Sequence, residues 1–290
     1  MQMDNSGVSL RCEETEDDHR ATGGQLRAAW DPSVSGRRVI QRLLGVEKRY
    51  MPSPLYVSLI QREPQRREEL VKWMLEVCCN CGCDEAVFPL SVSLMDRFLS
   101  VTLSAPTLPR CLAASCILVA SKLSECDSIT SDALCTAAEY DFLPVNLREM
   151  ERIVLATLRW DTAGVTPQDF LPHFLSLLDE WHRGDGSTLR RHSDTLVAMC
   201  SCDWRFLGAT PSLIAAASLN CALRGLGDRP YAVCSMLAEL CRAEPVVLEH
   251  YSEMIEHALR QRLGSGPAAK GDEMEDERAG TPTDMREIDF

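Results

Sequence analysis

The chain has 290 residues, of which 45% are hydrophobic and only 6% aromatic, enough for two domains of ordinary size, each with its own core. Residues 1–18 are polar and acidic, which excludes a secretory signal and a mitochondrial presequence. No apolar run is long enough to span a bilayer, so no membrane partner is expected. The 14 cysteines fall mostly within helical apolar patterns, which favours reduced thiols and a location in the nucleus and cytoplasm.

The formal net charge of −13 is concentrated at the two ends. Residues 1–20 contain six acids and two arginines, and residues 265–290 contain eight acids and three basic residues. The middle of the chain therefore carries about −4 and lacks the strong positive balance of a nucleic-acid binder. We expect no nucleic-acid partner.

Helical periodicity runs through the chain from residue 26 onward. Apolar side chains recur at helical spacing from Leu26 to Tyr50, and the segment Met51-Pro-Ser-Pro54 ends this first helix. Breakers such as Gly82 and Pro106 separate the stretches that follow. The pattern predicts five more helices: Gln65–Cys78, Val87–Leu99, Pro109–Leu123, Ser131–Ala138 and Pro144–Arg159. Because no alternating strand pattern intervenes, the predicted fold is all-α.

The stretch Cys111–Glu125 is apolar on every side as far as Lys122. A helix without a polar face is buried on all sides, so this one is predicted to be the central helix of a bundle. Lys122 lies where that helix should reach the surface. Its ammonium group must contact either water or the carbonyl oxygens of a partner.

A second group of helices repeats the first. Thr166, Pro167 and Asp169 form the pattern of a helix start, with the threonine as N-cap. Two later segments repeat two earlier ones in the same order: Asp203–Leu207 resembles Asp96–Leu99, and Pro211–Ser218 resembles Pro109–Ser115. Two copies of one helical domain are therefore predicted.

Patterns for catalysis or metal binding are sparse. The sequence has no Gly-rich phosphate loop, no His-Glu-x-x-His motif and no serine elbow, so we predict no catalytic residue and no cofactor. The segment Cys78-Cys-Asn-Cys-Gly-Cys83 is the strongest metal candidate, but its thiols are too crowded for the usual pairwise zinc ligation. We interpret it as a helix end and turn. An enzyme that uses this cluster stays as an alternative.

Each tail carries one short motif. Leu10, Cys12 and Glu14 are spaced by two, so an extended peptide would turn all three toward a groove on a partner, although spacing alone also fits chance. Thr281 precedes a proline and follows an acidic run, which suits a proline-directed kinase. From Gly264 onward almost nothing can form a core, and disorder is predicted.

The chain resembles the D-type cyclins over nearly its whole length. The segments that carry the resemblance are Trp73–Val77, Val87–Leu90, Met95–Ser100, Val119–Lys122 and Met150–Glu151, with Leu10–Glu14 and Thr281–Phe290 at the ends. The resemblance implies two tandem five-helix cyclin boxes, at 53–162 and 163–263, preceded by an N-terminal helix at 26–52. Acidic tails at 1–25 and 264–290 would carry a retinoblastoma-docking motif and a phosphodegron.

The family implies a non-catalytic, activating subunit of a cyclin-dependent kinase that controls the G1/S transition and directs phosphorylation of retinoblastoma-family proteins. By position, Lys122 would donate to kinase carbonyl groups and Glu151 would accept nearby. Asp96 and Arg97 would orient helices within the first box. Kinase inhibitors, and a ubiquitin ligase that reads phosphorylated Thr281, would be further partners.

One surface departs from the family. On the first helix of the box, cyclins commonly expose methionine, isoleucine, leucine and tryptophan to dock Arg-x-Leu peptides. The corresponding residues of this chain are Arg66, Glu69, Leu70 and Trp73. Burying either charge against a peptide leucine is costly without a partner charge, and Leu70 and Trp73 can equally be core residues. A protein of the same fold that binds nucleic acid or acts as a protein adaptor, as in transcription factors, is the alternative function. It should show a basic face.

Overall fold

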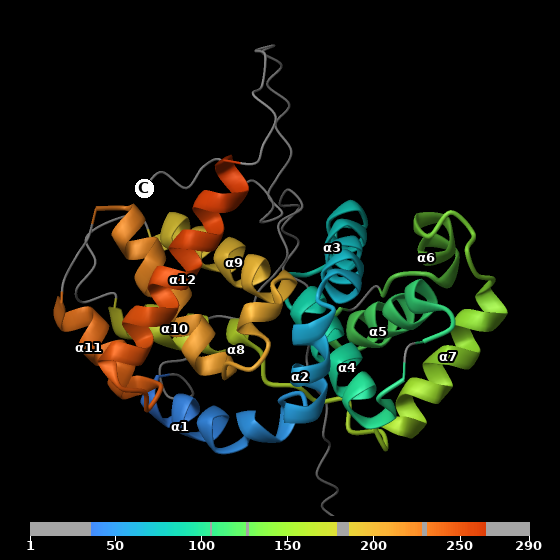
Figure 1. Ribbon diagram of the computed structural model, residues 1–290, viewed down its shortest axis with the longest axis horizontal. Coiled ribbons are helices and arrows are strands. Elements are labelled where there is room, and N and C mark those ends of the chain that lie inside the picture. The colour runs from blue at the N-terminus through green and yellow to red at the C-terminus, as the bar shows by residue number, and fades with distance from the viewer. Residues whose placement is uncertain (1–35, 105, 126–127, 179–185, 228–230, 265–290) are drawn as a thin grey trace, which may run out of the picture. The chain divides into compact units, whose positions relative to one another are not determined.

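The computed structural model describes residues 36–104, 106–125, 128–178, 186–227 and 231–264, and every regular element among them is a helix (Figure 1). The first group is α1 (Arg37–Val46), the 3₁₀ helix η2 (Glu47–Tyr50), α2 (Pro54–Arg62), α3 (Gln65–Asn80), α4 (Val87–Thr102), α5 (Pro109–Ser124), α6 (Ser131–Ala137) and α7 (Pro144–Thr157). The second group is α8 (Pro167–Leu178), α9 (Gly186–Cys202), the 3₁₀ helix η3 (Trp204–Phe206), α10 (Pro211–Gly225), α11 (Tyr231–Leu240) and α12 (Pro245–Gly264). None of the described helices is both long and apolar enough to cross a membrane.

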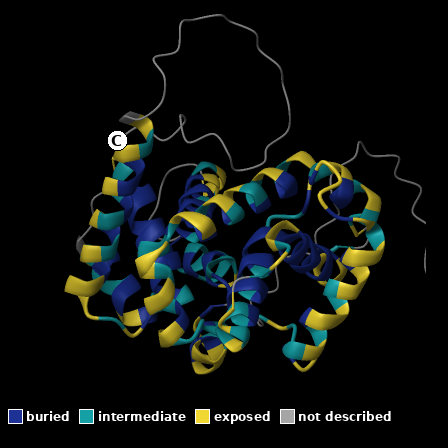
Figure 2. Ribbon diagram, turned by 45° about the vertical axis from the view of Figure 1, so that its right-hand side comes forward, coloured by how far each residue is buried: buried dark blue, intermediate teal, exposed yellow. Residues whose placement is uncertain are grey.

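Each of the two hydrophobic cores surrounds a central helix. In the first core, α5 contacts α3, α4 and α7 and is buried from Cys111 through Ser121. In the second core, α10 contacts α8, α9, α11 and α12 and is buried from Ser212 through Leu223. Figure 2 shows the buried segments enclosed by helices whose outer faces are exposed. The predicted buried helix and its repeat are confirmed, as are the five helices predicted between residues 65 and 159.

Helix α9 joins the two cores. Its residues Ala198 and Cys202 pack in the first core, although the rest of its buried apolar face belongs to the second. It contacts both α3 and α4. The two boxes therefore share a packed boundary, and a change on this face of α9 affects both cores.

The start of α8 is confirmed at Pro167, directly after Thr166. In a simple threonine cap the threonine side chain accepts a hydrogen bond from a backbone N–H in the first turn. Here Thr166 is the donor and the carboxylate of Asp169 is the acceptor. It accepts from the backbone N–H of Thr166 at 2.6 Å and from its hydroxyl at 2.9 Å. This arrangement places a negative charge in the first turn, where the helix dipole favours it.

Helix α2 is not among the helices predicted from the sequence. The sequence predicts that the segment ending at Pro54 stops a helix, but this segment also begins one. The hydroxyl of Ser53 accepts from the N–H of Tyr56 at 3.3 Å, and Pro54 occupies the first helical position. A serine N-cap followed by proline is a strong helix start, so the same residues end η2 and open α2.

Helix α1 packs in the second core, although the sequence places it ahead of the first. The predicted helix at 26–50 is described from Arg37 and becomes a 3₁₀ turn at Glu47. The buried side chains of Ile40 and Leu44 lie in the second core, and α1 contacts α8 (Figure 1). The sequence pattern identifies this apolar stripe but not the surface that covers it.

The turn after α1 also holds one end of α10. Glu47 is 3% exposed, and its carboxylate accepts from the backbone N–H and from the hydroxyl of Ser212, both at 3.0 Å. Ser212 lies in the first turn of α10, where unpaired backbone N–H groups attract a carboxylate. Burial raises the pKa of Glu47, and the hydrogen bonds from Ser212 act in the opposite direction. This contact fixes the N-terminus of the second central helix.

Candidate functional site

Lys122 and Glu151 meet where α5 reaches the surface. The Nζ atom of Lys122 lies 2.6 Å from Oε1 of Glu151, which α7 presents. The lysine side chain is 48% exposed and that of the glutamate 15%. An ammonium group has three donors, so this bond leaves donors for the acceptors of a partner. The structure thus brings together two residues that lie 29 positions apart and holds the lysine head at the surface.

The segment after α5 fixes the helix end that carries Lys122. The hydroxyl of Ser121 donates to the carboxylate of Glu125 and accepts from the N–H of Ile129 at 2.8 Å. The other carboxylate oxygen of Glu125 accepts from the N–H of Asp84 at 2.7 Å. These contacts connect the end of α5 to the turn after α3. The sequence-based prediction does not include these contacts, although a serine and a glutamate at i and i+4 are a recognisable signal.

Exposed apolar side chains accompany this pair. Leu123, next to Lys122, and Ile153 on α7 are both exposed. Val145, in the first turn of α7, is exposed as well. An ionic contact on helices that also expose aliphatic residues is typical of a protein-binding region, where apolar area supplies affinity and charges fix orientation.

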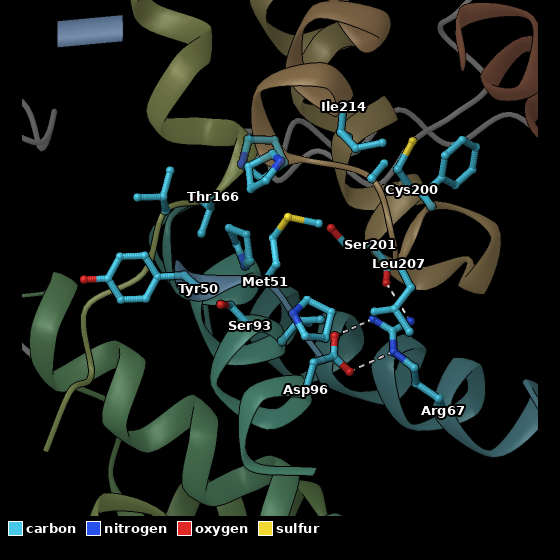
Figure 3. Close-up of a pocket in the computed structure, with 18 residues that line it drawn as sticks. Tyr50, Met51, Arg67, Ser93, Asp96, Thr166, Cys200, Ser201, Leu207 and Ile214 are labelled. Atoms are coloured by element: carbon cyan, nitrogen blue, oxygen red, sulfur yellow. Dashed lines mark hydrogen bonds and ion pairs between the residues drawn. The ribbon is translucent and has the colours of Figure 1, made fainter. Parts of the chain in front are cut away.

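A buried ionic cluster connects α2, α3, α4 and α9. Arg67 donates from Nε to Oδ1 of Asp96 at 2.9 Å and from Nη2 to Oδ2 at 2.7 Å, and the hydroxyl of Tyr56 donates to Oδ1 at 2.9 Å. Nη1 of Arg67 also reaches the backbone oxygen of Ser201 at 3.2 Å. Figure 3 shows Arg67 and Asp96 beside a cavity of about 110 Å³ at the boundary between the two boxes.

The electrostatics of this cluster keep the guanidinium group of Arg67 protonated. Burial lowers the pKa of Arg67, but the adjacent Asp96 carboxylate more than compensates, so the pKa lies above its ordinary value. Burial and the same carboxylate raise the pKa of Tyr56, which therefore stays a hydrogen-bond donor. The predicted orienting role of Asp96 is thus supported by the contacts of the carboxylate. Arg67, its partner, was missed because it stands within a run of charged residues typical of a solvated helix face.

Arg97 also has an internal role. Its guanidinium group donates to the backbone oxygens of Asp161 at 2.7 Å and Ala163 at 2.6 Å, and it lies over the ring of Tyr50 at 5.0 Å from the centroid. These contacts hold α4 against the segment between the two boxes. The contacts of Asp96 and Arg97 thus lie within this chain, which favours the predicted role of these residues in orienting helices.

The surface around Leu70 and Trp73, where the sequence differs from the usual cyclin pattern, forms a groove. This groove has a volume of about 820 Å³ and lies between α2, α3, α4 and the start of α5. Leu70 and Trp73 line it and are half-buried, so they are neither full core residues nor fully exposed. Arg66 and Glu69 are exposed at the same groove. The guanidinium group of Arg110 lies 5.9 Å from the centroid of the Trp73 ring. The groove is thus apolar inside and charged at its edges.

The remaining sequence candidates lie elsewhere. The cysteines from Cys78 to Cys83 lie at the end of α3 and in the turn after it, as interpreted from the sequence. Within the described part of the chain, no three or more His, Cys, Asp or Glu side chains are grouped to hold a metal ion. The tail residues Leu10, Cys12, Glu14 and Thr281 lie outside the described residues.

Comparisons with known proteins cover both groups of helices. A family profile described as the N-terminal domain of cyclins matches residues 38–163, and one described as the C-terminal domain matches residues 165–270. G1/S-specific cyclin-D1 of Danio rerio is 36% identical over 278 residues, which are 91% of this chain and 95% of that protein. G1/S-specific cyclin-D3 of Homo sapiens is 37% identical over 283 residues, which are 90% of this chain and 95% of that protein.

The solved structures add a likeness of fold. A viral cyclin from herpesvirus saimiri matches with a TM-score of 0.68 at 23% identity, covering 77% of this chain and 97% of that one. The yeast CTDK-1 complex, a kinase of the RNA polymerase II C-terminal domain, matches with a TM-score of 0.53 at 12% identity. At these identities the likeness concerns the arrangement of helices.

Proposed function

Because this chain belongs to the D-type branch of the cyclin family, we infer that it is a regulatory subunit of a cyclin-dependent kinase at the G1/S transition. The observation that carries this inference is the similarity to D-type cyclins over nine-tenths of both chains, with both boxes included. We propose that it acts in the nucleus and cytoplasm. The net charge of −13 does not favour the nucleic-acid-binding alternative.

We propose that the surface around Lys122 and Glu151 binds the mobile helix and activation segment of the kinase. The cyclin supplies no catalytic group in this mechanism. Its effect is to favour the active conformation of the kinase, and a shift from about 1% to 99% active requires roughly 5.5 kcal/mol of differential binding. An interface on the order of 2,000 Å² or more, partly apolar, can supply that free energy. Exposed Leu123 and Ile153 would contribute to it.

The direct test is reconstitution with purified cyclin-dependent kinases. The chain is expected to co-purify with a kinase of the D-cyclin-binding type and to raise its activity toward a retinoblastoma-protein fragment. The kinase alone, and the kinase with an unrelated helical protein, are the controls. A complex that forms without any gain in kinase activity would contradict the activating role.

We propose retinoblastoma-family proteins, kinase inhibitors and a ubiquitin ligase as further partners. The support for the first is the tail motif Leu10, Cys12 and Glu14, and for the last it is Thr281 within the acidic tail. Inhibitors and substrates that carry an Arg-x-Leu segment would use the groove of Leu70 and Trp73. We expect Arg66 and Glu69 to narrow the set of peptides that bind there, because a charge buried without a partner is costly.

The docking motif gives a prediction of its own. Replacing Leu10, Cys12 and Glu14 together by alanine is expected to abolish capture of the retinoblastoma protein from solution, because all three side chains would face the same groove. Kinase activation should be unchanged. The matched control replaces Arg11 and Glu13, which an extended strand turns to the opposite face. If both variants capture the retinoblastoma protein equally well, the spacing of Leu10, Cys12 and Glu14 is a chance pattern and not a docking motif.

The C-terminal motif predicts a change in lifetime. Thr281→Ala is expected to lengthen the half-life of the protein in cells after translation is blocked, because phosphate at this site would add about two negative charges for a receptor to read. Thr283→Ala is the matched control, since that threonine precedes aspartate rather than proline. If the Thr281 variant decays at the same rate as the unchanged protein, the degradation role is wrong.

A further inference from the structure

The cysteine-rich turn after α3 has the hydrogen bonds of a Schellman motif. The N–H of Cys83 donates to the carbonyl of Cys78 at 3.0 Å, and the N–H of Gly82 donates to the carbonyl of Cys79 at 3.1 Å. Gly82 has a φ of 65°, the left-handed conformation that this motif requires. In such motifs the side chains at the positions of Cys78 and Cys83 usually contact each other. Here both are thiols.

Cys83 differs from the other described cysteines in the direction of its pKa shift, which is downward. Cys78 is 4% exposed and Cys83 is 9% exposed. The hydrogen bond between the two thiols lowers the pKa of Cys83 and raises that of Cys78, although burial and the nearby Glu125 oppose the change at Cys83. Burial raises the pKa of Cys116 and of Cys200, which keeps those thiols protonated and unreactive.

We propose that Cys78 and Cys83 form a thiol pair that a hydroperoxide oxidises reversibly to an intramolecular disulfide. The thiolate of Cys83 attacks one peroxide oxygen, the O–O bond breaks, and the product is a sulfenic acid plus water or an alcohol. The Cys78 thiol then attacks the sulfenic sulfur, forming the S–S bond and releasing one water molecule. Two thiols are oxidised while one peroxide is reduced.

The backbone brings the two cysteines close together. Disulfides join residues whose Cα atoms lie about 4.4–6.8 Å apart, and the hydrogen bond from the N–H of Cys83 to the carbonyl of Cys78 holds these two residues side by side. The covalent bond would replace a contact that the motif makes in any case. The next residue, Asp84, donates its N–H to Glu125 at the end of α5. Oxidation would therefore fix a turn that is bonded to the helix carrying Lys122.

The experiment uses the full chain, reduced and then treated with hydrogen peroxide at increasing molar ratios. Free thiols are alkylated with one reagent, and thiols recovered after reduction are alkylated with a second. Because the chain has no lysine or arginine between Lys72 and Arg97, trypsin yields one peptide that contains Cys78, Cys79, Cys81 and Cys83. Fragment ions then assign each label. We expect Cys78 and Cys83 to carry the second label before any other cysteine does.

Variants separate the proposed pair from its neighbours. Cys79→Ser combined with Cys81→Ser is the matched control, and it should oxidise as the unchanged chain does. Cys83→Ser should leave Cys78 with the first label at every peroxide ratio, with the helical circular dichroism signal unchanged. The proposal is overturned if Cys81, which is exposed, takes the second label while Cys78 and Cys83 keep the first. It is also overturned if Cys78 and Cys83 take neither label, because they would then be oxidised to a state that reduction does not reverse.

Discussion

Asp96→Ala is expected to lower the free energy of unfolding by about 3–5 kcal/mol. The substitution leaves the guanidinium group of Arg67 buried without a counter-charge, since Arg67 is only 5% exposed. It also removes the acceptor of the Tyr56 hydroxyl. Replacing both members of a buried ion pair by apolar residues often changes the free energy of unfolding little. Removing only one member costs far more, because the remaining charge cannot reach water.

Urea denaturation measures this effect as a lower midpoint with an unchanged slope. The matched control is Arg37→Ala, which breaks the exposed pair with Glu239, where both side chains are more than half exposed. That change should cost at most about 1 kcal/mol. Replacing Arg67 by methionine and Asp96 by leucine together should recover much of the loss. A cost for Asp96→Ala within the range of the exposed control would contradict the prediction, because the substitution would then leave no uncompensated buried charge.

Lys122→Glu is expected to weaken kinase binding by about 2–5 kcal/mol, or about 300-fold at the middle of that range. The substitution removes donors that a kinase carbonyl would accept and places a second carboxylate beside Glu151. Because the partner would exclude water from this surface, both effects should exceed those of a solvent-exposed pair. Kinase activity measured at increasing concentrations of the variant should show a correspondingly shifted midpoint.

Two further variants define the role of the lysine. Lys72→Glu makes the same change of charge at an exposed position of α3 and should leave activation unchanged. The swapped double variant Lys122→Glu with Glu151→Lys restores the ion pair within the chain but not the position of the cation. If this double variant activates the kinase fully, the pair serves only to hold α5 and α7 together, and the proposed donation to the kinase is wrong.

The central helices were predictable because their sequence alone specifies their environment. The segment Cys111–Ser121 has no polar face, and neither has its repeat in α10, so burial on all sides follows without knowledge of the neighbours. Helix α2 was missed because proline and serine before Tyr56 end one element and begin another. A sequence pattern that stops a helix is hard to separate from one that starts the next.

The contacts of the candidate site were only partly predictable. The resemblance to D-type cyclins assigned roles to Lys122 and Glu151, but the ion pair between them depends on how α5 packs against α7. Arg67 gave no signal, because a buried arginine and a solvated one look alike in a charged run. Its partner lies 29 positions away, and only the packed helices bring the two together.

The packing of α1 in the second core has a consequence for synthesis on the ribosome. Ile40 and Leu44 leave the ribosome early, but the core that receives them includes residues as late as Leu259. The second box therefore cannot complete its core until nearly the whole chain has emerged, and this contact closes a loop that contains the entire first box. If the chain were cut between the boxes, the C-terminal half would expose the apolar surface that α1 covers. This fragment should bind chaperones more strongly than the intact chain.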